Sequence, residues 1–285
     1  MSGPAAGPPL VLAIAGFDPT SGAGVSADIK TISANQAYGI ACITALTIQD
    51  SQGARGYRNV PAAFFEEQLD CLLSDLPPSA VKIGMLGSQE TVEVVARQLK
   101  RHNSPWVVLD PIFAATSGSA LSDENSWSLM RKRLFPLTSV LTPNLAEAER
   151  LTGLKLEKPA DAEQAARALH QMGPRYVVIK GGHWERPVDV LYDGDQITIL
   201  AADRVRTAHT HGTGCTFSAA LAANLANGHP VHDAVVMAKA YLTAALKQSF
   251  AIGTGPGPVN HLYRLHESQP SRNVDPAPLI EFTTR

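Results

Sequence analysis

The chain has 285 residues and a formal net charge of −2, with no dense block of Lys or Arg. This length is sufficient for a large hydrophobic core. The near-neutral balance provides no basic excess to neutralise a nucleic-acid backbone, so a nucleic-acid partner is excluded. No apolar run approaches the length needed to cross a bilayer, so no membrane partner is expected.

The three cysteines are Cys42, Cys71 and Cys215, an odd number with wide spacing and no CxxC pair. This usage favours a reducing compartment and argues against a disulfide framework or a structural zinc site. Residues 1–9, MSGPAAGPP, lack the basic start and apolar stretch of a signal peptide and are predicted to form a flexible tail. A cytoplasmic location is therefore predicted.

The first half of the chain alternates apolar runs with helical patterns. The run 11–15 ends at Gly16 and is typical of a strand buried on both faces of a parallel sheet. After a glycine-rich loop, Ser26 is predicted to cap a helix over 27–35, and Ser88 one over 90–101. Further strands are predicted at 40–48, 80–86 and 106–109, with a helix at 62–76. Short connections between alternating elements predict an α/β fold with crossover helices.

The second half repeats this rhythm. Helices are predicted at 124–134, 145–152, 160–172, 216–227 and 231–248, and strands at 139–141 and 176–180, after a loop over 112–122. Alternation around Asp193-Gly194 predicts an antiparallel hairpin over 188–200. Gly and Pro accumulate from residue 253, which predicts a peripheral or weakly ordered extension over 253–285. A single domain over 10–252 is the simplest organisation.

A glycine turn, His211-Gly212-Thr213-Gly214-Cys215, opens the Ala-rich helix pattern. The unpaired N–H groups at such a helix start, beginning with that of Thr213, can bind a phosphate with the support of the helix dipole. A thiol at this position is expected to have a stabilised thiolate, which can act as a base or as a hydrogen-bond acceptor. The alternative is a structural glycine turn with a buried, inert cysteine.

Unusual residues follow nearly every predicted parallel strand. Ligands of open parallel sheets bind beyond the carboxyl ends of the strands, so these positions predict a site. Asn144 and Glu147, three residues apart, could hold the water shell of Mg²⁺ or could simply cap a helix. Lys180 ends an apolar strand, where phosphate is a natural partner. The amide of Gln49 matches the edge of an aminopyrimidine or pyridine ring, or else it caps a turn.

Seven motifs in order carry a family resemblance: AGFDPTSGAG, ITALTIQ, KIGML, DPIFAATSG, LTPNLAEAE, VIKGGH and THGTGCTFSAALAANLA. Over residues 11–250 the chain resembles the hydroxymethylpyrimidine and phosphomethylpyrimidine kinase family of thiamine biosynthesis, within the ribokinase-like superfamily. The resemblance implies a Rossmann-like, three-layer α/β/α fold with a mostly parallel central sheet. It also implies ATP-dependent phosphorylation of 4-amino-5-hydroxymethyl-2-methylpyrimidine and then of its monophosphate, with Mg²⁺, often by a homodimer.

The same resemblance assigns site residues by motif. The pyrimidine is expected to contact Gln49, Gly16, Met85, Ile112 and Asp18. Gly212, Thr213 and Gly214 would form the anion hole, and Cys215 stands where most ribokinase-like sugar kinases carry an aspartate base. ATP is expected to contact Lys180, Thr207, His209 and Asn144. Glu147 and Asp110 would hold Mg²⁺ through water.

Three positions depart from the family pattern: Phe17, Thr116, which replaces a common lysine, and His209, which replaces an asparagine. Two alternatives follow from the residues. One is a pyridoxal kinase, because pyridoxal also carries a hydroxymethyl group on a flat heteroaromatic ring and Cys215 could meet its aldehyde as a thiohemiacetal. The other is a non-catalytic ligand-binding or regulatory paralogue that has kept the pocket.

Overall fold

The computed structural model describes residues 7–113, 124–182, 184–266 and 281–284, so Thr116 and most of the predicted loop over 112–122 lie outside the described part. The centre of the fold is a parallel sheet of apolar strands, and in all of them except β2 nearly every side chain is buried. Such runs are expected where helices cover both faces of a sheet. The parallel strands are β1 (Leu10–Phe17), β2 (Tyr38–Asp50), β4 (Ala80–Ile83), β5 (Trp106–Leu109), β6 (Val140–Leu141) and β7 (Tyr176–Ile179).

Antiparallel strands extend this sheet at both edges. Within the described residues the strand order is β10-β9-β8-β7-β6-β5-β4-β1-β2-β3. β3 (Gly53–Asn59) pairs with β2, and β8 (Val188–Tyr192), β9 (Ile197–Ala201) and β10 (Glu281–Thr284) follow β7. The mostly parallel centre and the hairpin over 188–200 are thus confirmed, whereas β3 and β10 were not predicted.

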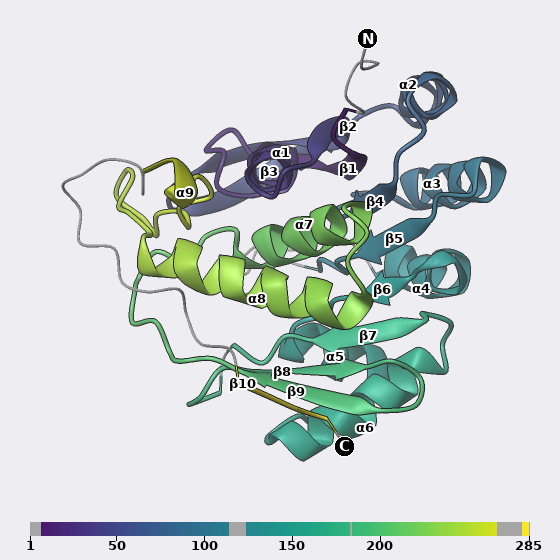
Figure 1. Ribbon diagram of the computed structural model, residues 1–285. Coiled ribbons are helices and arrows are strands. Elements are labelled where there is room, and N and C mark those ends of the chain that lie inside the picture. Colours follow the sequence, from purple (N-terminus) through teal and green to yellow (C-terminus); the bar gives the residue numbers. More distant parts are fainter. Residues whose placement is uncertain (1–6, 114–123, 183, 267–280, 285) are drawn as a thin grey trace, which may run out of the picture.

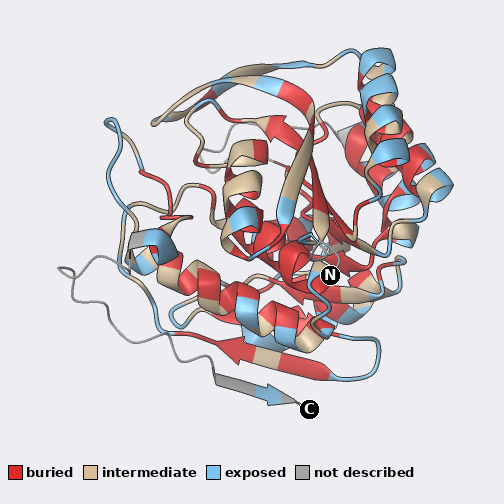
Figure 2. Cartoon of the chain, turned by 45° about the horizontal axis from the view of Figure 1, so that its top comes forward, coloured by how far each residue is buried: buried red, intermediate tan, exposed pale blue. Residues whose placement is uncertain are grey.

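Helices form a layer on each face of the sheet (Figure 1). One layer contains α1 (Gly24–Ala34), α7 (Thr213–Ala226) and α8 (Val231–Lys247). The other contains α2 (Ala62–Asp75), α3 (Gln89–His102), α4 (Glu124–Arg133), α5 (Leu145–Thr152) and α6 (Pro159–His170). Each layer has its own apolar core against the sheet, and Figure 2 shows buried residues concentrated on the strands and on the helix sides that face them. The predicted three-layer α/β/α architecture is confirmed.

The helix that follows the glycine turn, α7, is the most enclosed helix of its layer. It contacts α1, α8 and the strands β1, β4 and β5, and its residues from Cys215 to Leu225 are all buried. A helix that is apolar all round belongs in the interior, and its alanines let neighbouring elements approach closely. The position of its N-terminus is therefore fixed by packing on several sides.

Two helix starts test the predicted caps. The Ser88 hydroxyl accepts the Thr91 N–H at 3.2 Å, as predicted for α3. The prediction that Ser26 caps a helix beginning at Ala27 is wrong, because α1 begins at Gly24 and its N-cap is Ala23. Its start is set instead by the preceding loop, where the Asp18 carboxylate accepts the Ala23 N–H at 2.9 Å.

The C-terminal segment is more integrated than its composition predicts. Val259 is fully buried, His261 is 3% exposed, and the His261 carbonyl accepts the Tyr241 hydroxyl. β10 adds a strand to the sheet edge by pairing with β9. Residues 257–261 of the predicted peripheral extension are thus buried against the domain, whereas 253–256 are mostly exposed. Gly and Pro content alone does not reveal a few well-placed apolar contacts.

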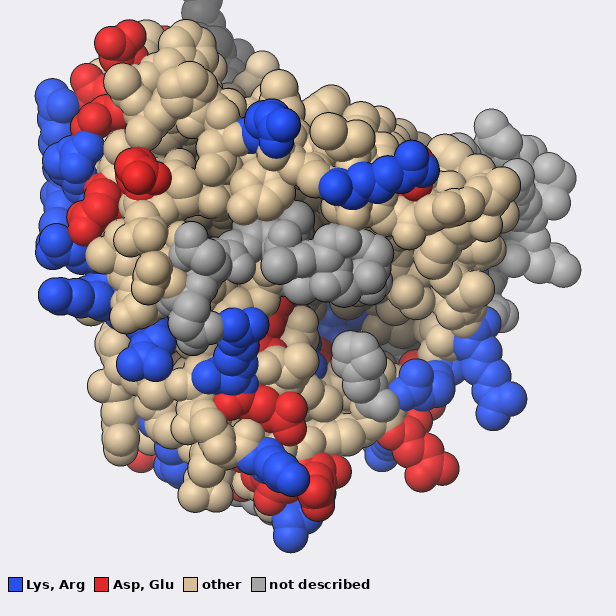
Figure 3. Space-filling view, turned by 180° about the vertical axis from the view of Figure 1, so that it is seen from behind, with Lys and Arg blue, Asp and Glu red and all other residues tan. Residues whose placement is uncertain are grey.

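The surface carries charges of both signs. Along the edge formed by α2 and α3, basic and acidic side chains are intermixed (Figure 3), and Arg97 pairs with Glu66 at 2.8 Å and Arg101 with Asp70 at 2.6 Å. Among the described residues, no helix combines the length and the apolar character needed to span a bilayer.

Candidate active site

A cavity of about 840 Å³ lies at the carboxyl ends of the parallel strands. This is the place where open parallel sheets bind ligands. The structure brings thirteen of the fifteen proposed site residues to its wall: Gly16, Asp18, Gln49, Met85, Asp110, Ile112, Asn144, Glu147, Lys180, Gly212, Thr213, Gly214 and Cys215. Thr207 and His209 do not line it. The Thr207 hydroxyl lies 2.8 Å from that of Ser249, and His209 Nδ1 accepts the Gly257 N–H.

The glycine turn delivers an uncapped helix N-terminus to the cavity. Gly212 is the N-cap of α7, and no side chain accepts hydrogen bonds from the first turn. Its φ of +84° is left-handed, and a Cβ there would lie 1.8 Å from the Gly22 carbonyl oxygen, so only glycine fits. The Thr213 N–H donates to the Thr210 carbonyl at 3.4 Å, whereas the N–H groups of Gly214 and Cys215 have no partner within the helix, and both residues line the cavity. The arrangement suits an anion.

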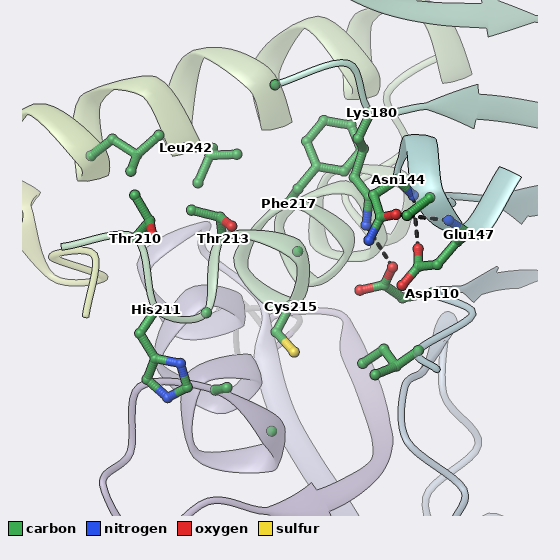
Figure 4. A pocket seen from close by; sticks show the side chains of 18 of the residues that line it. Asp110, Asn144, Glu147, Lys180, Thr210, His211, Thr213, Cys215, Phe217 and Leu242 are labelled. Atoms are coloured by element: carbon green, nitrogen blue, oxygen red, sulfur yellow. Dashed lines mark hydrogen bonds and ion pairs between the residues drawn. The ribbon is translucent and has the colours of Figure 1, made fainter. Parts of the chain in front are cut away.

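Cys215 lies between His211 on one side of the cavity and Asp110 with Lys180 on the other, and its sulfur points into the space between them (Figure 4). Burial raises the pKa of the Cys215 thiol to about 11, although the Lys82 ammonium and the Gly24 N–H act in the opposite direction. Burial of the sulfur thus opposes the stabilised thiolate that was expected from its place at a helix N-terminus, and it outweighs the Lys82 ammonium and the Gly24 N–H.

A buried ion pair between Lys82 and Asp28 lies close enough to Cys215 for its charges to act on the thiol. Lys82 Nζ on β4 lies 2.8 Å from Asp28 Oδ2 on α1, and both side chains are fully buried. The second carboxylate oxygen, Asp28 Oδ1, has no hydrogen-bond partner among the described residues. Burial raises the pKa of Asp28 to about 6, with Lys82 opposing the shift. The pair was not singled out in the sequence, although a lysine within the apolar strand AVKI was a visible signal.

A second cluster is centred on Asp110, at the end of β5. Lys180 Nζ lies 2.6 Å from Asp110 Oδ1 (Figure 4). The Ser218 hydroxyl donates to Asp110 Oδ2 at 3.2 Å. Burial acts to lower the pKa of Lys180, but the carboxylates of Asp110 and Glu147 outweigh it and raise the pKa. Lys180 is therefore a permanent cation at the cavity wall.

Asn144 and Glu147 form a capping box at the start of α5. Asn144 Oδ1 accepts the Glu147 N–H at 2.9 Å, and Glu147 Oε2 accepts the Asn144 N–H at 2.7 Å. The helix-cap alternative is thus present, yet both residues also line the cavity. Burial raises the pKa of Glu147 to about 7, Asp110 adds to this, and Lys180 opposes it. A cation bound beside Glu147 would stabilise the ionised carboxylate, which burial and Asp110 disfavour.

The donor set also bears on magnesium. Within the described residues, no group of three or more His, Cys, Asp or Glu side chains is arranged to hold a metal ion. Mg²⁺ usually keeps several waters and takes one or two carboxylates together with substrate phosphates. Asp110 and Glu147, with the Asn144 amide beside them, fit this way of binding Mg²⁺. They are too few to coordinate the ion with protein ligands alone.

The wall at the end of β2 carries a polar cluster that includes a residue not predicted. Gln49 lies beside Thr47, and its amide approaches His211, whose Nε2 lies 2.7 Å from Asp18 Oδ2. His211 stands within the THGTGC motif, but nothing in its spacing indicated which way its side chain points. Phe17 also lines the cavity here.

Another part of the wall comes from β8 and α8. Asp189 Oδ2 lies 2.7 Å from Lys239 Nζ, and Asp189 Oδ1 accepts the Gly181 N–H at 3.0 Å. This pair fixes the backbone directly after β7. Apolar Leu242 and Leu246 of α8 lie near it along the same cavity. An ion pair between β8 and α8 could not be read from residues fifty positions apart.

This three-layer fold, with an uncapped helix N-terminus at the carboxyl ends of the strands, is the ribokinase-like α/β fold of the vitamin kinases. The family model described as phosphomethylpyrimidine kinase matches residues 18–260, and the chain belongs to that family. The resemblance carried by the seven motifs is thereby confirmed.

The relatives agree with this assignment. The chain is 42% identical over 261 residues to hydroxymethylpyrimidine/phosphomethylpyrimidine kinase of Synechococcus elongatus, covering 90% of this chain and 98% of that protein. It is 44% identical over 254 residues to the thiamine biosynthesis bifunctional protein ThiED of Geobacter sulfurreducens, covering 88% of this chain but only 52% of that protein. This chain thus spans about half of that relative.

A solved structure is also similar. The pyridoxal kinase of Staphylococcus aureus in complex with AMP-PCP and pyridoxal superposes with a TM-score of 0.87 at 33% identity. The match covers 98% of this chain and 100% of that chain. It therefore compares the two folds over nearly their whole length.

Proposed function

We propose that this protein transfers the γ-phosphoryl group of ATP to the hydroxymethyl oxygen of 4-amino-5-hydroxymethyl-2-methylpyrimidine, and then a second phosphoryl group to the resulting monophosphate. One observation carries the proposal: a single cavity holds a ring-recognising amide at Gln49, a thiol at Cys215 and an uncapped helix N-terminus at α7. Membership of the phosphomethylpyrimidine kinase family supports it.

The residues divide the work in the following way. Gln49 pairs with the ring edge, and Gly16, Met85 and Ile112 flank it. The first-turn N–H groups of α7 stabilise negative charge on the transferred group, and such preorganised donors are the main catalytic device in phosphoryl transfer. The Lys180 ammonium adds positive charge on the same side.

Cys215 contributes as a neutral thiol. A protonated sulfur cannot remove the alcohol proton, so it orients the substrate hydroxyl through a hydrogen bond. In a loose transition state the alcohol needs little prior deprotonation, and its proton can leave late to a phosphoryl oxygen. The thiol therefore serves positioning, not base catalysis.

Asp110, Glu147 and Asn144 are proposed to hold Mg²⁺ through water. When bound, the ion would neutralise charge on the ATP phosphates. The ATP phosphates themselves are proposed to contact Lys180. Solved relatives crystallised with ATP analogues and ADP support a nucleotide site in this fold.

A homodimer is also proposed. Leu46 and Ile48 lie two residues apart on β2 and therefore project from the same face of the strand, where they are 51% and 60% exposed. Exposed neighbouring apolar side chains of this size favour burial against a partner. Light scattering on the Leu46→Lys variant tests this, with a monomer expected. We further propose a cytoplasmic location, since Cys42, Cys71 and Cys215 are all free thiols.

The second candidate is pyridoxal kinase, which the similarity to a pyridoxal complex favours. A coupled ATPase assay with Mg²⁺ on hydroxymethylpyrimidine, its monophosphate and pyridoxal separates the candidates. Turnover on the first two compounds is expected. Turnover on pyridoxal alone would replace the proposal with the second candidate, and no turnover on any of the three would favour the non-catalytic paralogue.

A further inference from the structure

The side chain of His211 connects three segments at the ring end of the cavity. It belongs to the turn before α7, and its Nε2 lies 2.7 Å from Asp18 Oδ2 in the loop before α1 and 3.3 Å from the amide nitrogen of Gln49 on β2. The Asp18 side chain is 4% exposed and that of His211 17%. None of the catalytic roles assigned above uses this imidazole.

The carboxylate decides where the imidazole proton lies. Burial acts to raise the pKa of Asp18, but hydrogen bonds from His211 and Thr20 outweigh it and lower the pKa. Asp18 is therefore ionised and can only accept hydrogen bonds. It accepts the Thr20 N–H at 2.8 Å and the Ala23 N–H at 2.9 Å. The His211 Nε2 atom facing it must be the protonated, donating nitrogen.

A donating Nε2 restricts the neighbouring amide. If the amide nitrogen of Gln49 faced this N–H group, two donors would oppose each other. A half-turn of the amide places Oε1 there, where it shares with Asp18 the single Nε2–H group of His211, and turns Nε2 toward the Thr47 hydroxyl, at the other amide contact of 3.3 Å. The Thr47 hydroxyl donates to the Phe17 carbonyl at 3.0 Å, so its oxygen is left to accept. One amide orientation satisfies all of these groups.

The imidazole itself has little freedom. A Cβ on Gly22 would lie 2.2 Å from His211 Cδ2 and 2.9 Å from Nε2, so the loop before α1 passes directly against this edge of the ring. Asp18 of the same loop accepts a hydrogen bond from Nε2. The loop before α1 therefore holds the donor that lies beside Gln49.

We propose that His211 is a positioning residue that locks the orientation of the Gln49 amide and thereby sets which heteroaromatic rings the kinase accepts. This inference rests on the proposed function. An amide of fixed orientation presents its acceptor and donor in one order. That order suits a ring nitrogen beside an exocyclic amino group and opposes the 4-oxo counterpart, whose carbonyl accepts and whose ring N–H donates.

The test compares the binding of two rings. Isothermal titration calorimetry measures the Kd of 4-amino-5-hydroxymethyl-2-methylpyrimidine and of its 4-oxo counterpart. The wild-type protein is expected to prefer the amino ring by about 100-fold or more, because a mismatch leaves buried polar groups unpaired. His211→Phe, which keeps a ring but removes the donor, lowers this preference about tenfold, the factor that about 1.4 kcal/mol represents. His211→Gln returns a donor and recovers part of the preference.

Lys30→Met is the matched control. Lys30 Nζ donates to the Ser21 carbonyl of the same loop, so its loss loosens the loop without removing the donor beside Gln49. The ratio of the two Kd values in Lys30→Met is expected to match that of the wild type. ATP affinity is expected to be unchanged in both His211 variants.

Three results would overturn the proposal: a His211→Phe ratio within twofold of the wild type, an equal change in Lys30→Met, or a wild-type protein that binds both rings equally. None of them bears on the proposed function, which the kinase assay with the amino ring tests separately. Conversely, a protein that binds the rings with the expected ratios but transfers no phosphate would refute the proposed function alone.

Discussion

Replacing Lys82 by Met isolates the cost of an unpaired buried charge. The side chains have similar lengths, so the cavity changes little, but Asp28 is left fully buried without its cation. Its Oδ1 already lacks a partner. Breaking a fully buried pair on one side costs about 3–5 kcal/mol. For a domain of this size that corresponds to a melting temperature lower by roughly 6–20 °C.

Urea unfolding at several pH values tests the electrostatic origin. The folded-state pKa of Asp28 is raised by burial from 3.8 to about 6. Protonated Asp28 therefore contributes to the free energy of unfolding. This contribution is fully present below pH 3.8 and is lost as the pH rises through about 6. Without Lys82 the folded-state pKa rises further, so the loss continues at higher pH. The stability difference between wild type and Lys82→Met is thus expected to narrow as pH falls from about 8 to 5.

The double variant Lys82→Met/Asp28→Asn is the control, because it removes both charges. It is expected to recover more than half of the lost stability, since replacing both members of a buried pair is often close to neutral. A cost below about 1 kcal/mol for Lys82→Met, where about 3–5 is expected, or a difference that is constant with pH, would refute the reasoning.

Three further predictions concern catalysis. Cys215→Ala is expected to lower kcat about 100-fold, because the substrate hydroxyl is no longer positioned. If Cys215 acted as a thiolate base of raised pKa, wild-type kcat would rise tenfold per pH unit between about 6.5 and 8.5, and no such rise is expected. Gly214→Ala keeps the backbone N–H but places a Cβ 3.4 Å from both Asp110 Oδ2 and Lys180 Nζ, in the space proposed for the transferred group; kcat is expected to fall about 10²-fold because that group is misplaced, and an unchanged kcat would contradict a phosphoryl group seated at Gly214. Glu147→Gln keeps the cap acceptor, so the Mg²⁺ concentration for half-maximal activity rises about 10–100-fold at a similar melting temperature; a change in stability alone would leave Glu147 as a cap.

The strand ends explain how much of the site was predictable. A parallel sheet places the carboxyl ends of its strands together, so Gln49, Asp110, Asn144 and Lys180 could be expected at one edge without coordinates. Local rules also predicted the Ser88 cap and the hairpin around Asp193-Gly194.

Pairings across the fold were not predictable in the same way. The ion pairs Lys82–Asp28 and Lys239–Asp189 depend on how helices lie over the sheet, which no local pattern encodes. The pKa of Cys215 depends on burial from several elements, and this outweighed the local helix-terminus argument. Strands β3 and β10 lack the apolar runs by which the inner strands were recognised, because they lie at sheet edges.

The enclosure of α7 has a consequence for a kinase with two successive acceptors. The alcohol oxygen and the phosphate oxygen lie at different distances from the pyrimidine ring, by the length of one phosphoryl group. A helix packed against α1, α8 and three strands cannot retreat to make room. If the donors at its tip bind the transferred group as proposed, they stay in place through both transfers, and the substrate must shift, with its ring seated farther from α7 in the second reaction than in the first.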